Sequence, residues 1–424
     1  MSATTTLTSR ADRAGARAAA GRAAALAVER PTTIEALRLI WEEERISRAE
    51  IARRTGLSRS TISAAVTDLL ASGLVAEVGA GPSRGGRRPI ELQFQYDRYA
   101  IVGVDLGASH VAVALTNLHG EVRAFAEESV PVRTDPDAAL RAMLELTGSC
   151  LARWEGSRRR LIGIGVAVPS PVDPHRRDRL SDVVAPAWRG RSVTAGLAKR
   201  FAVPVLMDND ANLGALAEQW WGAGRGATES VYIKVATGVG SGHIIGGKIY
   251  RGASGTAGEI GHVAIDPHGP VCVCGLRGCL VTFVGTEALL ERARDLLRND
   301  RDSLLDARTL SITAIEDAAL AGDLIATQIV GEAADYLGIA VAGMLNLLNP
   351  AVVSIGGSLA RLGEKLLEPL RKAVQSRTLV SSVAAAEIVA SELGVHDVAV
   401  GASTLVLDAA LEDLSYFPAA RSTR

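Results

Sequence analysis

The stretch from Gly252 to Cys279 most constrains the fold of this chain, because three of its four cysteines fall there within eight positions. It reads GASGTAGEIGHVAIDPHGPVCVCGLRGC. Thiolate sulfur and imidazole nitrogen are the ligands that tetrahedral Zn²⁺ prefers, and four protein ligands leave no open coordination position. We therefore expect a structural zinc ion that shapes a loop and performs no chemistry; the alternative is a chance cluster of small buried residues. The expected ligands are His262, Cys272, Cys274 and Cys279.

The same stretch carries a family resemblance. Its run G-x-x-G-x-A-G-E-I-G-H, followed by C-x-C-G-x-x-G-C, resembles the pattern of the ROK family, which contains bacterial sugar kinases and sugar-responsive transcriptional repressors. The resemblance covers roughly residues 100 to 410. It implies an α/β fold with a two-lobed, actin-like (ribonuclease H-like) sugar-kinase domain and a structural zinc loop.

Length and charge set the outer limits. A chain of 424 residues is expected to form two or three domains, at about 100–200 residues each. Its net charge of −1 gives no overall field for a polyanion, so any nucleic-acid contact must come from a local basic surface. The remaining Cys150 does not fit a disulfide framework and suits the reducing cytoplasm of a bacterium. No run approaches the roughly 18 apolar residues of a membrane span, so we expect no membrane contact.

Residues 31 to 98 are expected to form a winged helix-turn-helix domain. Apolar residues recur at helical spacing from Thr33, Ser47 and Glu50 form a capping box for a second helix, and Gly56 permits the turn before a third helix capped by Ser58. The outward positions near the start of that third helix, where base edges and phosphates are contacted, are Arg59, Ser60, Thr61 and Ser63.

Two short strands joined by a basic, glycine-rich loop follow and are expected to form the wing. We expect Arg84, Arg87 and Arg88 in this loop to contact phosphates of double-stranded DNA. The alternative is a small helical protein-interaction domain with a charged loop. Residues 1 to 30, which are rich in alanine and arginine, are expected to be a flexible basic tail.

The second domain, residues 99 to 424, opens with D-L-G-A-S between two apolar segments, so Asp105 and Gly107 are expected at a turn between two strands. Gly107 lets backbone amides approach a phosphate, Asp105 can hold Mg²⁺ through water, and Ser109 can donate a hydroxyl, although an ordinary hairpin would also account for the pattern. The strand, glycine-rich turn and strand recur at residues 231 to 250, which predicts two lobes that close on ATP and Mg²⁺. Residues 352 to 358, a buried strand followed by two glycines, resemble the adenosine-contact segment of the family; the alternative is a plain strand-to-helix turn. The other expected ATP contacts are Thr237, Gly238, Gly240, Gly356 and Gly357.

Polar side chains crowd the carboxyl end of a buried strand at residues 208 to 212, and such strand ends line clefts in α/β folds. By resemblance, Asp210 matches the catalytic base that takes a proton from the sugar hydroxyl. Asn209, Glu259 and His262 match the residues that contact the sugar. The alternative is simple helix capping by Asp208 or Asn209.

One departure from the family pattern bears on the ligand. Val281 stands where the family has a glutamate that contacts the sugar. A valine cannot accept a hydrogen bond, and an unpaired buried hydroxyl costs about 1–3 kcal/mol. A modified or deoxygenated sugar, a different effector, or no small ligand are the alternatives to an ordinary hexose.

In this family, fused winged helices go with regulation. We therefore predict a DNA-binding transcriptional regulator, a repressor of carbohydrate metabolism genes, with a kinase-like domain that senses a sugar or sugar derivative. Operators with two-fold symmetry imply a homodimer or homotetramer. The alternative is an ATP-dependent sugar kinase (glucokinase-like) with an appended DNA-binding domain, which would rest on Asp105, Asp210 and the two glycine loops.

Overall fold

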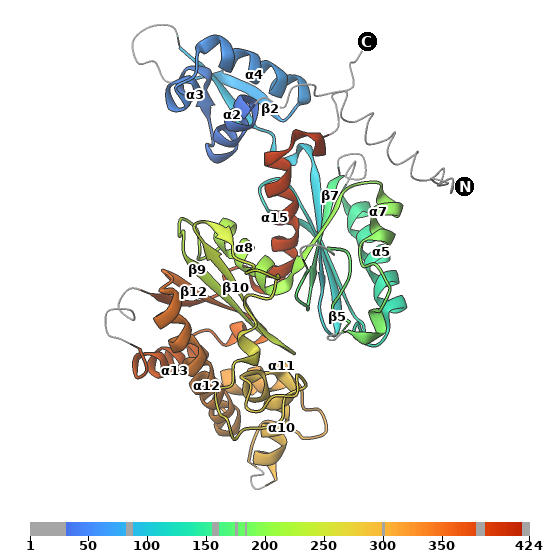
Figure 1. Ribbon diagram of the computed structural model, residues 1–424, viewed down its shortest axis with the longest axis vertical. Helices are drawn as coiled ribbons and strands as arrows, with labels where there is room; N and C mark the ends of the chain where they lie inside the picture. Colours follow the sequence, from blue (N-terminus) through green and yellow to red (C-terminus); the bar gives the residue numbers. More distant parts are fainter. Residues whose placement is uncertain are drawn as a thin grey trace, which may run out of the picture.

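The computed structural model describes residues 31–81, 88–154, 161–173, 177–182, 185–298, 302–378 and 386–417. It shows a small domain joined to two larger lobes (Figure 1). The expected basic tail, residues 1 to 30, lies outside the described residues, as do Arg84 and Arg87 of the expected wing. The predicted fold class, a winged helix followed by a two-lobed α/β domain, is confirmed.

The small domain is a winged helix-turn-helix. Its sheet has the order β1-β3-β2 and packs on three helices. Ser47 caps α3 by accepting a hydrogen bond from the Glu50 amide, and Ser58 caps α4 by accepting one from the Thr61 amide. Gly56 has a φ of 68° at the turn between these helices, a conformation that glycine adopts without strain. The elements are α2 (Pro31–Glu42), β1 (Ile46–Ser47), α3 (Arg48–Thr55), α4 (Arg59–Ser72), β2 (Val75–Ala80) and β3 (Ile90–Phe94).

The first lobe is built on a five-stranded sheet of order β6-β5-β4-β7-β8. Helix α5 packs on one face, and α15, which comes from the end of the chain, packs on the other (Figure 1). The approach of α15 requires glycine in the sheet, because a Cβ at Gly103 or at Gly165 would lie 1.8 Å from a backbone oxygen of α15. The elements are β4 (Ala100–Leu106), β5 (His110–Thr116), β6 (Val122–Ser129), α5 (Pro136–Arg153), β7 (Leu161–Val168), α7 (Ala195–Phe201), β8 (Val205–Asn209) and α15 (Asp397–Glu412).

The second lobe repeats the strand and hairpin arrangement of the first. Its sheet has the order β11-β10-β9-β12-β13 and is covered by a layer of helices. Helix α8 (Asp210–Trp221) packs against α15 and against β9 and β10, so it joins the two lobes. The elements are β9 (Ser230–Val235), β10 (Val239–Ile245), β11 (Lys248–Ile249), α9 (Val281–Val284), α10 (Thr286–Leu297), α11 (Ile312–Ala321), α12 (Leu324–Leu348), β12 (Val352–Gly357), α13 (Glu364–Gln375) and β13 (Glu387–Ala390).

Two segments, Leu324–Leu348 and Gly394–Glu412, are long and apolar enough to cross a membrane, which corrects the expectation that no segment is. In the most apolar window of each, 56% and 67% of the residues are buried inside the protein. Neighbouring elements cover these helices on several sides, and that burial accounts for their apolar composition.

Candidate functional site

Three consecutive polar residues form the junction between β8 and α8. Asn209 caps α8 by accepting hydrogen bonds from the amides of Ala211 and Asn212, so the capping alternative holds for this residue. Its side-chain amide donates to the backbone oxygen of Ser170 at 3.3 Å. Asp208 is buried and paired with Arg251, whose Nε lies 2.7 Å from its carboxylate. These contacts fix the junction and leave Asp210 at the first position of α8.

A buried lysine lies between the two carboxylates that the sequence assigns to the site. The Nζ of Lys234, on β9 of the second lobe, lies 2.9 Å from the Asp210 carboxylate and 3.9 Å from that of Asp105 on β4 of the first lobe. The three side chains are only 11–14% exposed. Burial alone would lower the pKa of Lys234, but the two carboxylates raise it well above its usual value. The lysine is therefore charged and connects the lobes.

Sequence reasoning missed Lys234. The signal was present, because a single lysine interrupts the otherwise uncharged strand S-V-Y-I-K-V. A charged side chain in a buried strand needs a partner of opposite charge nearby.

The sequence predicts that Asp105 lies in the turn between two strands. In the structure it is instead the penultimate residue of β4. Its carboxylate lies 3.2 Å from Nε2 of His110, while its Oδ1 has no hydrogen-bond partner among the described residues. Burial opposes ionisation of Asp105, but Lys234 and His110 outweigh it and lower its pKa. Asp105 is therefore held as a carboxylate.

The expected phosphate contacts lie in two different environments. Ser109, Thr237 and Gly238 are exposed in the turns of the two hairpins, and Gly240 has only the Ala211 methyl nearby. A Cβ at Gly107, by contrast, would lie 2.3 Å from the His110 ring.

The two glycines that end β12 are explained by packing. A Cβ at Gly356 would lie 2.2 Å from the Tyr232 hydroxyl, and one at Gly357 would lie 2.3 Å from the backbone oxygen of Val235. Contact of either glycine with adenosine stays a prediction.

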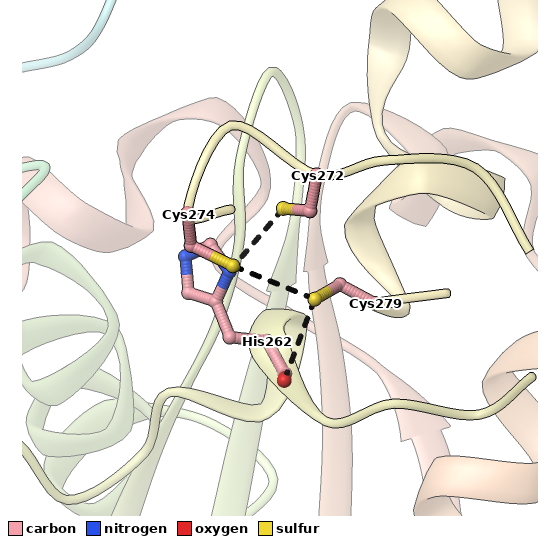
Figure 2. Close-up of side chains that lie close together, drawn as sticks. All are labelled: His262, Cys272, Cys274 and Cys279. Carbon is pink, nitrogen blue, oxygen red and sulfur yellow. Dashed lines mark hydrogen bonds between the residues drawn. The ribbon is translucent and has the colours of Figure 1, made fainter. Parts of the chain in front are cut away.

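The four expected metal ligands lie together, with their ligand atoms within 4.8 Å of one another (Figure 2). Nδ1 of His262 lies 3.6 Å from the sulfur of Cys272, and the sulfurs of Cys274 and Cys279 are also 3.6 Å apart. Two sulfurs at about 2.3 Å from a tetrahedral Zn²⁺ would lie about 3.8 Å apart, so the cluster has the spacing to hold a metal ion. Glycines at 275 and 278, with φ of 88° and 66°, turn the loop that brings the cysteines together.

The two ring nitrogens of His262 face different groups. While Nδ1 faces the thiols, Nε2 lies 3.9 Å from the carboxylate of Glu259. Burial and, more weakly, Asp210 raise the pKa of Glu259, whereas His262 lowers it. Glu259 therefore interacts electrostatically with both His262 and Asp210. Val281, at the start of α9, packs against the apolar core of the second lobe.

The residues expected to contact DNA gather at the start of α4. Arg59, Ser60 and Ser63 are exposed, and Thr61 is half-buried. The hydroxyls of Ser60 and Thr61 lie 2.8 and 2.7 Å from that of Ser58, the capping residue. Arg88 is exposed beside β3.

An aromatic cluster, which sequence reasoning did not anticipate, joins the winged helix to α8. The ring of Trp41 on α2 lies 5.2 Å from that of Trp220 and 6.0 Å from that of Trp221, measured between centroids. Trp41 Nε1 also donates to the backbone oxygen of Leu118, and Trp221 Nε1 donates to Thr404 on α15. One end of α8 therefore lies beside Lys234, and the other end contacts the winged helix domain.

The chain resembles known regulators over most of its length. It is 31% identical to a xylose repressor of Caldicellulosiruptor bescii over 388 residues, which cover 90% of this chain and 96% of the relative. It is 32% identical to the xylose repressor of Bacillus subtilis, over 88% of this chain and 94% of the relative. The DNA-binding transcriptional dual regulator NagC of Escherichia coli is 30% identical, over 89% and 92%.

Solved structures resemble the same fold. A ROK family transcriptional regulator, described as a homolog of the E. coli MLC protein, superposes with a TM-score of 0.75 and 25% identity over 91% of this chain and 96% of its own. A ROK family glucokinase from Streptomyces griseus, in complex with glucose and AMPPNP, has a TM-score of 0.66 and 28% identity over 72% and 98%. Residues 29–76 match the winged helix-turn-helix DNA-binding family, and residues 101–409 match the ROK family. The chain therefore belongs to the ROK family, as a member with an N-terminal winged helix-turn-helix domain.

Proposed function

We propose that this protein is a DNA-binding transcriptional regulator, a repressor of carbohydrate metabolism genes, whose two-lobed domain senses a sugar or sugar derivative. The observation that carries the proposal is helix α8. Asp210 begins this helix on the sugar side, and Trp220 and Trp221 end it against Trp41 of the DNA-binding domain. Twelve residues of helix form a rigid element about 18 Å long, so a shift at one end reaches the other.

The sugar is proposed to bind through Asn209, Asp210, Glu259 and His262. An effector changes DNA affinity only if it binds one conformation of the protein better than another. Closure of the lobes around a sugar would displace α8 and, through the aromatic cluster, the orientation of α2 and α4. In a homodimer or homotetramer this moves two recognition helices out of register with paired half-sites.

Zinc is the proposed occupant of the Cys₃His cluster. A metal held by Nδ1 of His262 would fix the ring so that Nε2 faces Glu259 and the sugar. Such pairing of a metal-bound histidine with a carboxylate on its other nitrogen is common in metal sites.

The names of the relatives support a sugar effector and a bacterial, cytoplasmic site of action, where operator DNA is found. The xylose repressors and the N-acetylglucosamine repressor of E. coli are named for two different sugars, so the effector class is proposed without choosing one sugar. The glucokinase with AMPPNP supports the second candidate function, an ATP-dependent sugar kinase, through the retained Asp210 and the open turn at Gly238.

The test is selection of genomic fragments by the purified, zinc-loaded protein at fixed salt, repeated with a panel of sugars. We expect a few palindromic sites that one sugar releases. Failure to retain any fragment selectively would overturn the regulator, and ADP release with the same sugars would then test the kinase.

A further inference from the structure

A cationic side chain joins the two lobes. Lys234 reaches from β9 of the second lobe to Asp105 of the first lobe and to Asp210 at the start of α8. The position of its backbone is fixed, because Ile233 and Val235 on either side of it are at most 1% exposed. The side chain of Lys234 is therefore anchored to a rigid strand of the second lobe.

A magnesium nucleotide does not fit these residues. A hydrated divalent ion held by Asp105 would have to share the space between two carboxylates with the ammonium group. Like charges a few ångströms apart in a largely buried site repel strongly. The His110 ring also lies against Gly107, at the place where the backbone would have to approach a phosphate.

Both carboxylate oxygens of Asp210 already have partners within the chain. Its Oδ1 accepts a hydrogen bond from the amide of Ala211 at 2.8 Å, and its Oδ2 accepts one from Lys234 at 2.9 Å. The remaining lone pairs can still accept a hydrogen bond from a sugar hydroxyl.

We propose that Lys234 is a tethered cation that takes the place of the magnesium nucleotide between the lobes, so that the protein binds the sugar without ATP. The positive charge between Asp105 and Asp210 is here part of the chain itself. The proposal rests on the sugar site of the proposed function and explains how that site signals without phosphoryl transfer.

The experiment is titration calorimetry of the zinc-loaded, full-length protein with MgATP. A separate titration uses MnCl₂ in place of magnesium. We expect no resolved binding to the wild type. Lys234→Ala leaves Asp105 and Asp210 facing one another, and we expect it to bind both probes at least about tenfold more tightly. Lys248→Ala, which removes an exposed lysine of β11, is the matched control and should behave as the wild type.

Two results would overturn the proposal: MgATP binding by the wild type that matches the Lys234→Ala variant, or a folded variant that gains no affinity for either probe. Lys234→Met keeps the apolar stem and serves as the folded variant if Lys234→Ala is unstable. Retention of operator DNA checks folding in each case. If the wild type binds both operator DNA and MgATP, only the proposal for Lys234 is contradicted. If the wild type retains no DNA selectively, only the proposed function as a regulator is contradicted.

Discussion

The indole ring of Trp41 lies 5.2 Å from the ring of Trp220, and the two residues belong to different domains. Trp41 is on the first helix of the DNA-binding domain, and Trp220 is in the last turn of α8. A contact between aromatic rings contributes about 0.5–1.5 kcal/mol beyond the area that it buries. A coupling free energy of about 1–3 kcal/mol between two sites is typical of allosteric proteins, so a contact of this size is large enough to matter.

Trp41→Leu should uncouple the sugar from DNA. We expect operator affinity without sugar to change by less than about threefold, while the sugar-induced loss of affinity, typically about 5–150-fold, shrinks toward none. Fluorescence anisotropy of labelled operator with and without sugar measures both quantities. Trp154→Leu, a half-buried tryptophan in the first lobe, is the control and should keep the response. A full response in Trp41→Leu would contradict the role of the aromatic cluster.

Arg59→Ala tests the DNA surface. Loss of one phosphate contact lowers the slope of log affinity against log salt by about one, and loss of a bidentate base contact costs about 1–3 kcal/mol. Operator titrations at several salt concentrations distinguish the two contributions. Arg141→Ala removes an exposed arginine of α5 and should leave the salt slope and the operator affinity unchanged. If the two variants lose equal operator affinity, the net charge of the protein and not a specific contact of Arg59 is responsible.

Asp210→Asn separates sensing from turnover. A hydrogen bond to a charged acceptor contributes about 1.5–3 kcal/mol, so the sugar concentration needed for release should rise about 10–150-fold. Operator affinity without sugar should stay the same, because Asn209 still caps α8. If the sugar response persists in this variant while any ADP release stops, signalling does not need phosphoryl transfer. An unchanged sugar concentration for release would remove Asp210 from the sugar site.

Cys274→Ser should empty the metal cluster. We expect zinc content to fall from about one ion per chain to nearly none, with a lower thermal midpoint, because the free energy of metal binding stabilises the folded loop. The sugar response should weaken as well, since His262 would lose its fixed orientation. Cys150→Ser, at a buried thiol in the first lobe, should retain the metal. Metal content equal to wild type in Cys274→Ser would contradict the assigned ligand set.

Asp397→Asn should change how stability depends on pH. Burial raises the pKa of Asp397 to about 6, although the Tyr232 hydroxyl and Lys234 act against it. Since the unfolded pKa is about 3.9, the folded protein binds this proton more tightly, and the contribution of Asp397 to the free energy of unfolding falls as pH rises from about 4 to about 6.

Urea unfolding of wild type and Asp397→Asn across this range isolates that contribution. We expect the wild type to lose stability relative to the variant as pH rises through the window. Asp335→Asn, at an exposed position on α12, is the control. Parallel curves for wild type and Asp397→Asn would contradict a raised pKa in the folded state.

Local features of the site were predictable from the sequence. Helix caps at Ser47 and Ser58 depend on neighbours three residues away, and the metal cluster depends on a short loop whose ligand spacing is written in the chain. Short-range patterns of this kind carry their own geometry.

The contacts across domains were not predictable in the same way. Lys234 meets Asp105, and Trp41 meets Trp220, only because two sheets and α8 bring distant segments together. A lysine in a strand or a tryptophan on a helix has no pattern that identifies its partner. The sequence predicts a turn at Asp105 because Gly107 dominates the local pattern. Pairing of β4 with β5 and β7 instead extends the strand beyond Asp105.

The packing of α15 on the first sheet also has a consequence for how the protein is made. Gly103 leaves the ribosome nearly 300 residues before Ala399, the residue that it touches, which corresponds to about 15–60 seconds of synthesis. During that time one apolar face of the first sheet has no cover and is available to chaperones. Since Val406 and Leu411 of α15 also belong to the core of the winged helix, the DNA-binding domain reaches its final position only when this late helix arrives.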